Sequence, residues 1–134
     1  MIRQEDMSAN FSKFHLNADG EEGWKIRPAL HRFTGPDLGE PHDHPWGFTS
    51  HILSGGYIEE IYHRNSGGWW IERVERFPKT AHTVQATCIH RIIALLEPEC
   101  WTLVMATGDK EREPRFWRFD GQHPKSRAWN ETWD

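Results

Sequence analysis

Between residues 24 and 119, short runs of β-forming residues follow one another, separated by turn signals such as Asn65-Ser66-Gly67-Gly68. Helical periodicity is scarce in this part of the chain. A series of closely spaced strands is typical of a β-sandwich or β-barrel. We therefore predict an all-β domain, with strands at residues 24–33, 48–53, 57–64, 69–77, 88–96, 101–106 and 115–119.

The two ends of the chain differ from this central part. Residues 1–20 are polar, and Met7, Phe11 and Phe14 recur at helical spacing. This spacing predicts a short helix within residues 5–15. We expect three segments: an N-terminal arm over residues 1–20, a β-domain over residues 21–119 and a polar C-terminal tail over residues 120–134.

Composition limits the classes of protein that fit. A chain of 134 residues supports one domain with one hydrophobic core. Only 37% of the residues are apolar, but eight tryptophans and seven phenylalanines supply a large area for burial. The net charge of −4 provides no basic surface for nucleic acid. Because we find neither a leader pattern at residues 1–6 nor an apolar run of about 18 residues, we expect a soluble, cytoplasmic protein without membrane contact.

The segment Pro41-His42-Asp43-His44-Pro45 contains two histidines that are two residues apart. Side chains alternate between the faces of an extended strand, so both imidazoles point the same way. The flanking prolines favour a strand at the rim of a sheet. His82 follows the next predicted hairpin, and we predict that it joins His42 and His44 in a three-imidazole metal centre. The alternative interpretations are a solvent-facing pair and an ordinary strand position for His82.

These residues resemble the two motifs of the cupin superfamily. The first motif is a His-x-His pair followed by a glutamate and a glycine, and it corresponds to His42, His44 and Gly55 or Gly56. The second motif, Pro-x-Gly-x-x-His, corresponds to residues 77–82, with a lysine at the glycine position and no later asparagine. The resemblance covers residues 24–119. It implies a single-domain cupin, which is an all-β jelly-roll barrel or double-stranded β-helix.

The glutamate of the first motif has no counterpart in this chain. Its position falls on Phe48 if Gly55 is the motif glycine, and on Thr49 if Gly56 is. In the Phe48 register, which the match at Gly55 favours, one corner of the site is apolar and Ser50 shares its inward direction. In the Thr49 register a hydroxyl would face a metal-bound water.

The resemblance also implies a chemistry. Three neutral imidazoles around a divalent cation leave a net charge of +2, which suits water or an anionic substrate in the open positions. Nitrogen ligands suit iron, zinc, nickel or copper rather than magnesium or calcium. Cupins that lack the glutamate are similar to the three-His thiol dioxygenases, so we favour Fe(II) and a dioxygenase acting on a small molecule. The many aromatic residues, together with the habit of cupins, favour a homodimer.

Two other functions fit the same residues. A cupin isomerase, epimerase or lyase would use zinc, nickel or no metal, whereas a non-enzymatic barrel would bind a small ligand or a partner protein. The missing glutamate and asparagine favour the non-enzymatic barrel. Around the site we expect Phe48, Ser50 and Arg32 to line a substrate pocket and His31 and Thr49 to support the ligands, with ordinary core or surface positions as the alternative for each.

Overall fold

The structure is a computed structural model that describes residues 2–16, 26–107, 110–119 and 123–133. Within these ranges the chain forms strands and no helix, so the described part also contains no helix able to cross a membrane. The strands are β1 (Arg3–Ser8), β2 (Phe11–His15), β3 (Ile26–Phe33), β4 (Phe48–Ser54), β5 (Tyr57–Asn65), β6 (Gly68–Arg76), β7 (Ala81–Val84), β8 (Ile89–Leu95), β9 (Cys100–Thr107), β10 (Arg115–Arg118) and β11 (Lys125–Ala128).

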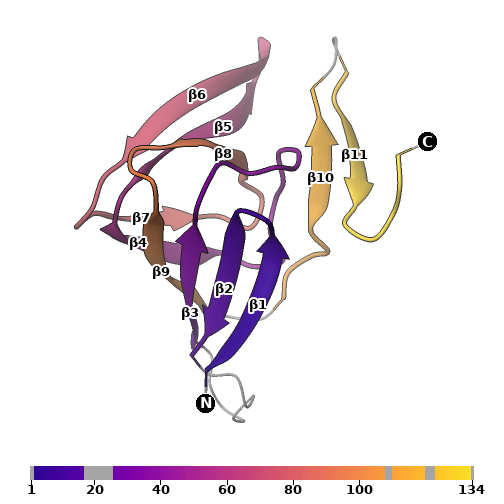
Figure 1. Cartoon of the computed structure of the whole chain (residues 1–134). Helices are drawn as coiled ribbons and strands as arrows, with labels where there is room; N and C mark the ends of the chain where they lie inside the picture. The colour runs from indigo at the N-terminus through magenta and orange to yellow at the C-terminus, as the bar shows by residue number, and fades with distance from the viewer. Residues whose placement is uncertain (1, 17–25, 108–109, 120–122, 134) are drawn as a thin grey trace.

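The strands form three antiparallel sheets. The largest has the order β1-β2-β3-β9-β4-β7, the second has the order β6-β5-β8, and β10 pairs with β11. Figure 1 shows the β10–β11 hairpin standing at one side of the other two sheets. The main core lies between the two larger sheets, because its buried residues come from both of them: Phe33, Ile52, Tyr57, Ile92 and Cys100. The all-β jelly-roll architecture predicted from the sequence is confirmed.

The strand β5 is buried on both faces, which explains its unusual composition. Tyr57 and Glu59 point to one face, whereas Glu60 and Tyr62 point to the other, and all four are less than a tenth exposed. Glu60 accepts hydrogen bonds from Tyr62 and from the guanidinium groups of two arginines on neighbouring strands. Two adjacent buried carboxylates in one strand therefore face different surroundings.

The turn between β4 and β5 requires glycine. Gly55 has φ +86° and Gly56 has φ +98°, in the left-handed region that side chains disfavour. A Cβ atom on Gly55 would also overlap the carbonyl oxygen of Glu99. The glycine pair at the end of the first motif is thus a structural necessity of this hairpin.

The helix predicted within residues 5–15 is wrong. This stretch forms the hairpin β1–β2, and β2 pairs with β3 along its whole length. The reason is tertiary pairing: the Phe11 ring stacks on the Phe33 ring at 4.5 Å, which draws the segment onto the sheet edge. In the predicted C-terminal tail, β11 likewise pairs with β10.

The remaining predicted strands agree with the structure within a few residues. The predicted strand 24–33 corresponds to β3, although residues 24 and 25 lie outside the described residues. The strand β7, which carries His82, was not predicted. It is only four residues long, which is too short to show a clear alternation of apolar and polar residues, and half of its side chains are exposed.

Candidate metal centre

The histidine pair lies on a short extended segment held between β8 and the C-terminal hairpin. His42 and His90 exchange two backbone hydrogen bonds of 3.0 Å, and the His44 N–H donates to the Ala86 carbonyl. On the other edge, the Pro41 carbonyl accepts a hydrogen bond from Trp117 N–H at 2.9 Å. His42 thus has a bridge partner on each edge, His90 and Phe116, so the segment does not lie at the rim of a sheet as its flanking prolines predicted.

Asp43 fixes the orientation of the pair from the opposite face. Its side chain is only 2% exposed and accepts hydrogen bonds from the Arg115 N–H at 2.7 Å and the Trp117 Nε1–H at 3.0 Å. Arg112 Nη2 lies 3.1 Å from the same carboxylate. Because neighbouring side chains alternate between the two faces, anchoring Asp43 on one face turns His42 and His44 to the other, which they share with His90, the partner of His42.

Three imidazoles meet on that inner side. Ligand nitrogens of His42, His44 and His90 all lie within 4.8 Å of one another. His44 Nε2 and His90 Nε2 are 2.8 Å apart. Two nitrogens bound at about 2.1 Å to one metal and separated by a right angle lie about 3 Å apart. The arrangement is therefore close to the one that a three-imidazole metal site requires.

Contacts behind the rings select the nitrogens that can bind a metal. His90 Nδ1 lies 3.0 Å from Glu59 Oε2, and His42 Nδ1 lies 3.3 Å from the Glu40 carbonyl oxygen. Both partners accept hydrogen bonds only, so each Nδ1 carries the proton and each Nε2 keeps its lone pair. In His90 this free nitrogen is the one that faces His44, as a ligand set requires.

Burial keeps the rings of His42 and His44 neutral. Desolvation, with the charge of His90 as the second cause, lowers the pKa of His42 to about 4. Desolvation followed by the charges of His90 and His42 also lowers the pKa of His44 well below its usual value. The ammonium group of Lys13 on β2 contributes in the same direction to both pKa values. Neutral imidazoles at physiological pH can bind a divalent cation without first losing a proton.

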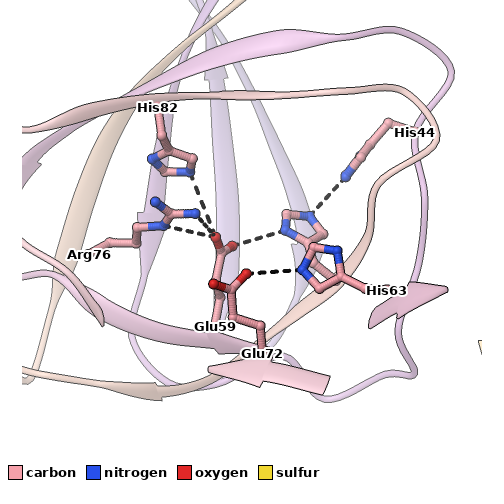
Figure 2. A network of polar contacts seen from close by, with 7 residues as sticks. His44, Glu59, His63, Glu72, Arg76 and His82 are labelled. Carbon is pink, nitrogen blue, oxygen red and sulfur yellow. Dashed lines mark hydrogen bonds and ion pairs between the residues drawn. The ribbon is translucent and has the colours of Figure 1, made fainter. Parts of the chain in front are cut away.

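Glu59 links the cluster to the interior of the barrel (Figure 2). Its Oε1 accepts hydrogen bonds from Arg76 Nε at 2.9 Å and Nη2 at 2.6 Å, while Oε2 faces His90. Burial by itself would raise the pKa of Glu59, but the hydrogen bonds and charges of His90 and Arg76 outweigh it and hold the pKa below its usual value. The carboxylate is therefore ionised, and it is only 1% exposed.

The structure does not bring His82 into this cluster. His82 lies on β7, where it pairs with Ser50 of β4. Its Nε2 is 4.0 Å from Glu59 Oε1, on the side of Arg76 (Figure 2). Among the described residues, neither of its buried ring nitrogens has a hydrogen-bond partner. Burial, followed by the charge of Arg76, lowers the pKa of His82 to about 4.

His90 was not part of the predicted ligand set, because the sequence analysis took His82 as the histidine of the second motif. The physical reason for the difference is strand pairing: the His-x-His segment pairs with β8, whereas β7 pairs with β4. The available signal was a histidine near the start of the apolar run 88–96, where a buried polar ring needs a partner.

The other predicted site residues are dispersed. The Phe48 ring lies 4.9 Å from the His44 ring, so it forms an apolar side of the cluster, and Ser50 is buried on the same face of β4. Thr49 points to the opposite face, beside Thr83 of β7. These positions favour the Phe48 register.

Two predicted residues lie on β3. Arg32 Nε binds Glu99 Oε1 at 2.7 Å, and with 42% of its side chain exposed it belongs to the surface rather than to the cluster. His31 packs against the Phe11 ring at 5.0 Å, and burial lowers its pKa to about 3. His31 shares its face of β3 with the core residue Phe33, so it points to the interior side of the barrel.

Comparison with known proteins identifies the fold. No family model matches the sequence, and no curated protein matches it. Among solved structures, a DMSP lyase matches at 19% identity with a TM-score of 0.62, covering 86% of this chain and 62% of that chain. This chain thus spans less than two thirds of that lyase.

Two further matches are closer in length. A cupin-2 domain from Rhodospirillum rubrum matches at 13% identity with a TM-score of 0.59, covering 91% of this chain and 76% of that chain. A candidate mannose-6-phosphate isomerase from Ralstonia eutropha matches at 14% identity with a TM-score of 0.57, covering 78% and 91%. At these identities the matches establish the architecture, and with the strand order and histidine segment described above they show that the chain has the cupin fold.

Proposed function

We propose that this protein is a metal-dependent enzyme that acts on a small molecule at the centre formed by His42, His44 and His90. The observation that carries the proposal is the convergence of these three partly buried imidazoles, with ligand nitrogens within 4.8 Å. The contacts behind the rings support it, because acceptors at two Nδ1 atoms leave the Nε2 lone pairs for a cation.

We favour Fe(II) and a dioxygenase reaction. All three ligands are nitrogens, and the Phe48 ring stands beside His44 instead of a carboxylate. When bound at such a site, iron supplies redox chemistry with dioxygen, whereas zinc supplies Lewis acidity. The chain itself holds three imidazoles close together, and the Phe48 ring packs against one side of the cluster.

The test has two parts. Elemental analysis of the protein as isolated should give about one transition metal per chain, with iron predominant after growth without added zinc. Oxygen consumption by the iron-loaded protein should then rise with a thiol or diol substrate. Metal content at background level would contradict the proposed centre, and oxygen consumption equal to that of a His90→Ala variant would contradict dioxygenase activity.

A non-redox reaction is the second candidate. Solved structures that share this fold include a DMSP lyase and a candidate mannose-6-phosphate isomerase. A lyase or isomerase would keep the same three ligands and use zinc or nickel. Stoichiometric zinc together with no oxygen uptake would favour this candidate over the dioxygenase.

A non-enzymatic binding role has one observation in its favour. Two surface hollows lie beside the C-terminal hairpin, and both are lined by Tyr62, Ile71 and Phe119 rather than by the imidazoles. A protein that binds a ligand there without a metal at the cluster would have this function. The cytoplasmic location and the homodimer stay predictions, and light scattering after gel filtration tests the latter.

A further inference from the structure

Glu59 is a buried carboxylate that contacts the candidate centre without belonging to its ligand set. In the pairing of β5 with β8, His90 lies opposite Ile61. Glu59, two residues along β5, therefore lies diagonal to His90 on the same face. Its Oε2 is 3.0 Å from His90 Nδ1, on the ring edge opposite to the nitrogen that faces His44.

The two oxygens of Glu59 have separate partners. Arg76 donates both of its hydrogen bonds to Oε1, at 2.9 and 2.6 Å. Oε2 is then left for His90, and the carboxylate cannot rotate without losing the bonds to Arg76. With only 1% of Glu59 exposed, water does not compete for these contacts.

This arrangement has a consequence for the centre. Three neutral imidazoles bring no negative charge to a divalent cation, and Phe48 supplies none. A carboxylate behind a ligand imidazole fixes the ring and increases the basicity of the ligand nitrogen. Here the carboxylate reaches the centre through His90.

We propose that Glu59 is a positioning residue, which holds His90 as the Nδ1–H tautomer and supplies through that ring the negative charge that the ligands lack. The inference rests on the proposed metal centre, but it makes a statement about His90 that holds without metal. Arg76 orients Glu59 and is not itself required for the tautomer.

The Glu59→Gln variant tests this with cobalt(II) as the probe. Arg76 donates to the oxygen it contacts, so the carbonyl oxygen of the introduced amide faces Arg76 and its NH₂ group faces His90. The NH₂ group can only donate, so it requires an unprotonated Nδ1 and shifts the proton to Nε2. We expect cobalt affinity to fall roughly 10- to 100-fold, the range typical of lost ligand-supporting contacts.

The chain offers a matched control. The Glu72 carboxylate lies 3.0 Å from His63 Nε2, the same separation as in the Glu59–His90 contact, but at an exposed position of the β5–β6 pair (Figure 2). Glu72→Gln removes an equal charge from an equal contact outside the centre, so we expect unchanged cobalt affinity. A loss equal to that of Glu59→Gln would show a general charge effect and overturn the inference.

The Arg76→Gln variant separates positioning from loss of the ion pair. Its amide can still donate to Oε1, and Glu59 keeps its contact with His90, so we expect cobalt affinity within about threefold of wild type, well short of the change expected for Glu59→Gln. If Arg76→Gln weakens cobalt binding as much as Glu59→Gln does, the ion pair rather than the Glu59–His90 contact is responsible, and the inference is wrong.

A measurement on the metal-free wild-type protein completes the test. Nitrogen-15 chemical shifts and two-bond couplings of His90 report which ring nitrogen carries the proton. We expect Nδ1–H in the wild type and Nε2–H in Glu59→Gln. An Nε2–H tautomer in the wild type would overturn the inference even if the variant did not fold, whereas a wild type with Nδ1–H that binds no cobalt would contradict only the proposed metal centre.

Discussion

His44 and His90 are separated by 46 positions in the sequence, yet their Nε2 atoms lie 2.8 Å apart. The approach depends on the two backbone hydrogen bonds between His42 and His90, which fix the register of the histidine segment on β8. A change of one residue in that register would turn the imidazoles to the opposite face. The candidate centre is thus a property of strand pairing rather than of a local sequence motif.

Replacing His90 and His82 separately tests which of them completes the centre. We expect His90→Ala to bind cobalt at background level, because it removes one of three converging nitrogens. We expect His82→Leu to retain one cobalt per chain, because His82 Nε2 faces Glu59 rather than the cluster. Cobalt absorption spectra and equilibrium dialysis measure both. Retention of cobalt by His90→Ala with loss in His82→Leu would restore His82 as the third ligand.

Much of the fold could be predicted from the sequence because its strands carry strong local signals. The hairpin β4–β5, for example, is marked by apolar alternation and by a glycine pair whose positive φ no other residue adopts easily. The N-terminal hairpin could not be predicted in the same way. Phe11 fits a helical repeat as well as a strand, and only its contact with Phe33 decides between them.

The candidate site was likewise predictable only in part. His42 and His44 are two residues apart, so strand alternation alone gives their common direction. The third ring comes from another strand, and nothing local distinguishes His82 from His90. Both side chains are 12% exposed, and only the pairing of the segment with β8 selects His90. The supporting role of Glu59 has the same origin, because it depends on a diagonal contact between strands.

The metal-free protein should lose stability in mild acid. Burial lowers the pKa of His31 to about 3 and those of His42 and His82 to about 4, from an ordinary value of 6.5. Between pH 6.5 and 4 the unfolded chain therefore binds more protons than the folded one. The free energy of unfolding is thus highest above pH 6.5 and decreases as the pH falls below it. Urea unfolding at a series of pH values measures this dependence.

His82→Leu provides the matched variant for that experiment. The His82 side chain is 12% exposed, and its pKa shift corresponds to an acid-dependent loss on the order of 3 kcal/mol. The variant should be at least as stable as the wild type at pH 7, because it removes two buried nitrogens without partners. Its stability should also decrease less between pH 6.5 and 4. Parallel pH curves for the two proteins would show that His82 is not a source of the acid sensitivity.

Phe48→Glu should strengthen metal binding. The Phe48 ring lies 4.9 Å from the His44 ring, so a carboxylate at this position can reach a cation bound by the imidazoles. A fourth, charged ligand should lower the dissociation constant for manganese and iron more than that for copper, because oxygen ligands suit the harder cations. Isothermal titration measures the change.

The same variant should be less stable without metal. A carboxylate in place of a partly buried ring is desolvated, with a cost of about 1–3 kcal/mol. Phe48→Leu is the control, since it keeps an apolar side chain and should leave the dissociation constant near that of wild type. Equal metal affinity in Phe48→Glu and Phe48→Leu would place the ring outside the reach of the cation.

Asp43→Ala should loosen the C-terminal hairpin and, with it, the histidine pair. The Asp43 carboxylate is 2% exposed and accepts hydrogen bonds from the Arg115 N–H and the Trp117 Nε1–H, with Arg112 Nη2 at 3.1 Å. Removing it leaves buried donors and a charge without a partner, which costs roughly 3–5 kcal/mol. Glu113→Gln is the control, because Glu113 is exposed just before the same hairpin and accepts the Trp129 Nε1–H at 3.0 Å. Amide hydrogen exchange at β10 together with cobalt affinity should change in Asp43→Ala and stay unchanged in Glu113→Gln. Faster exchange with unaltered cobalt affinity would mean that β8 alone is sufficient to hold His42 and His44 in place.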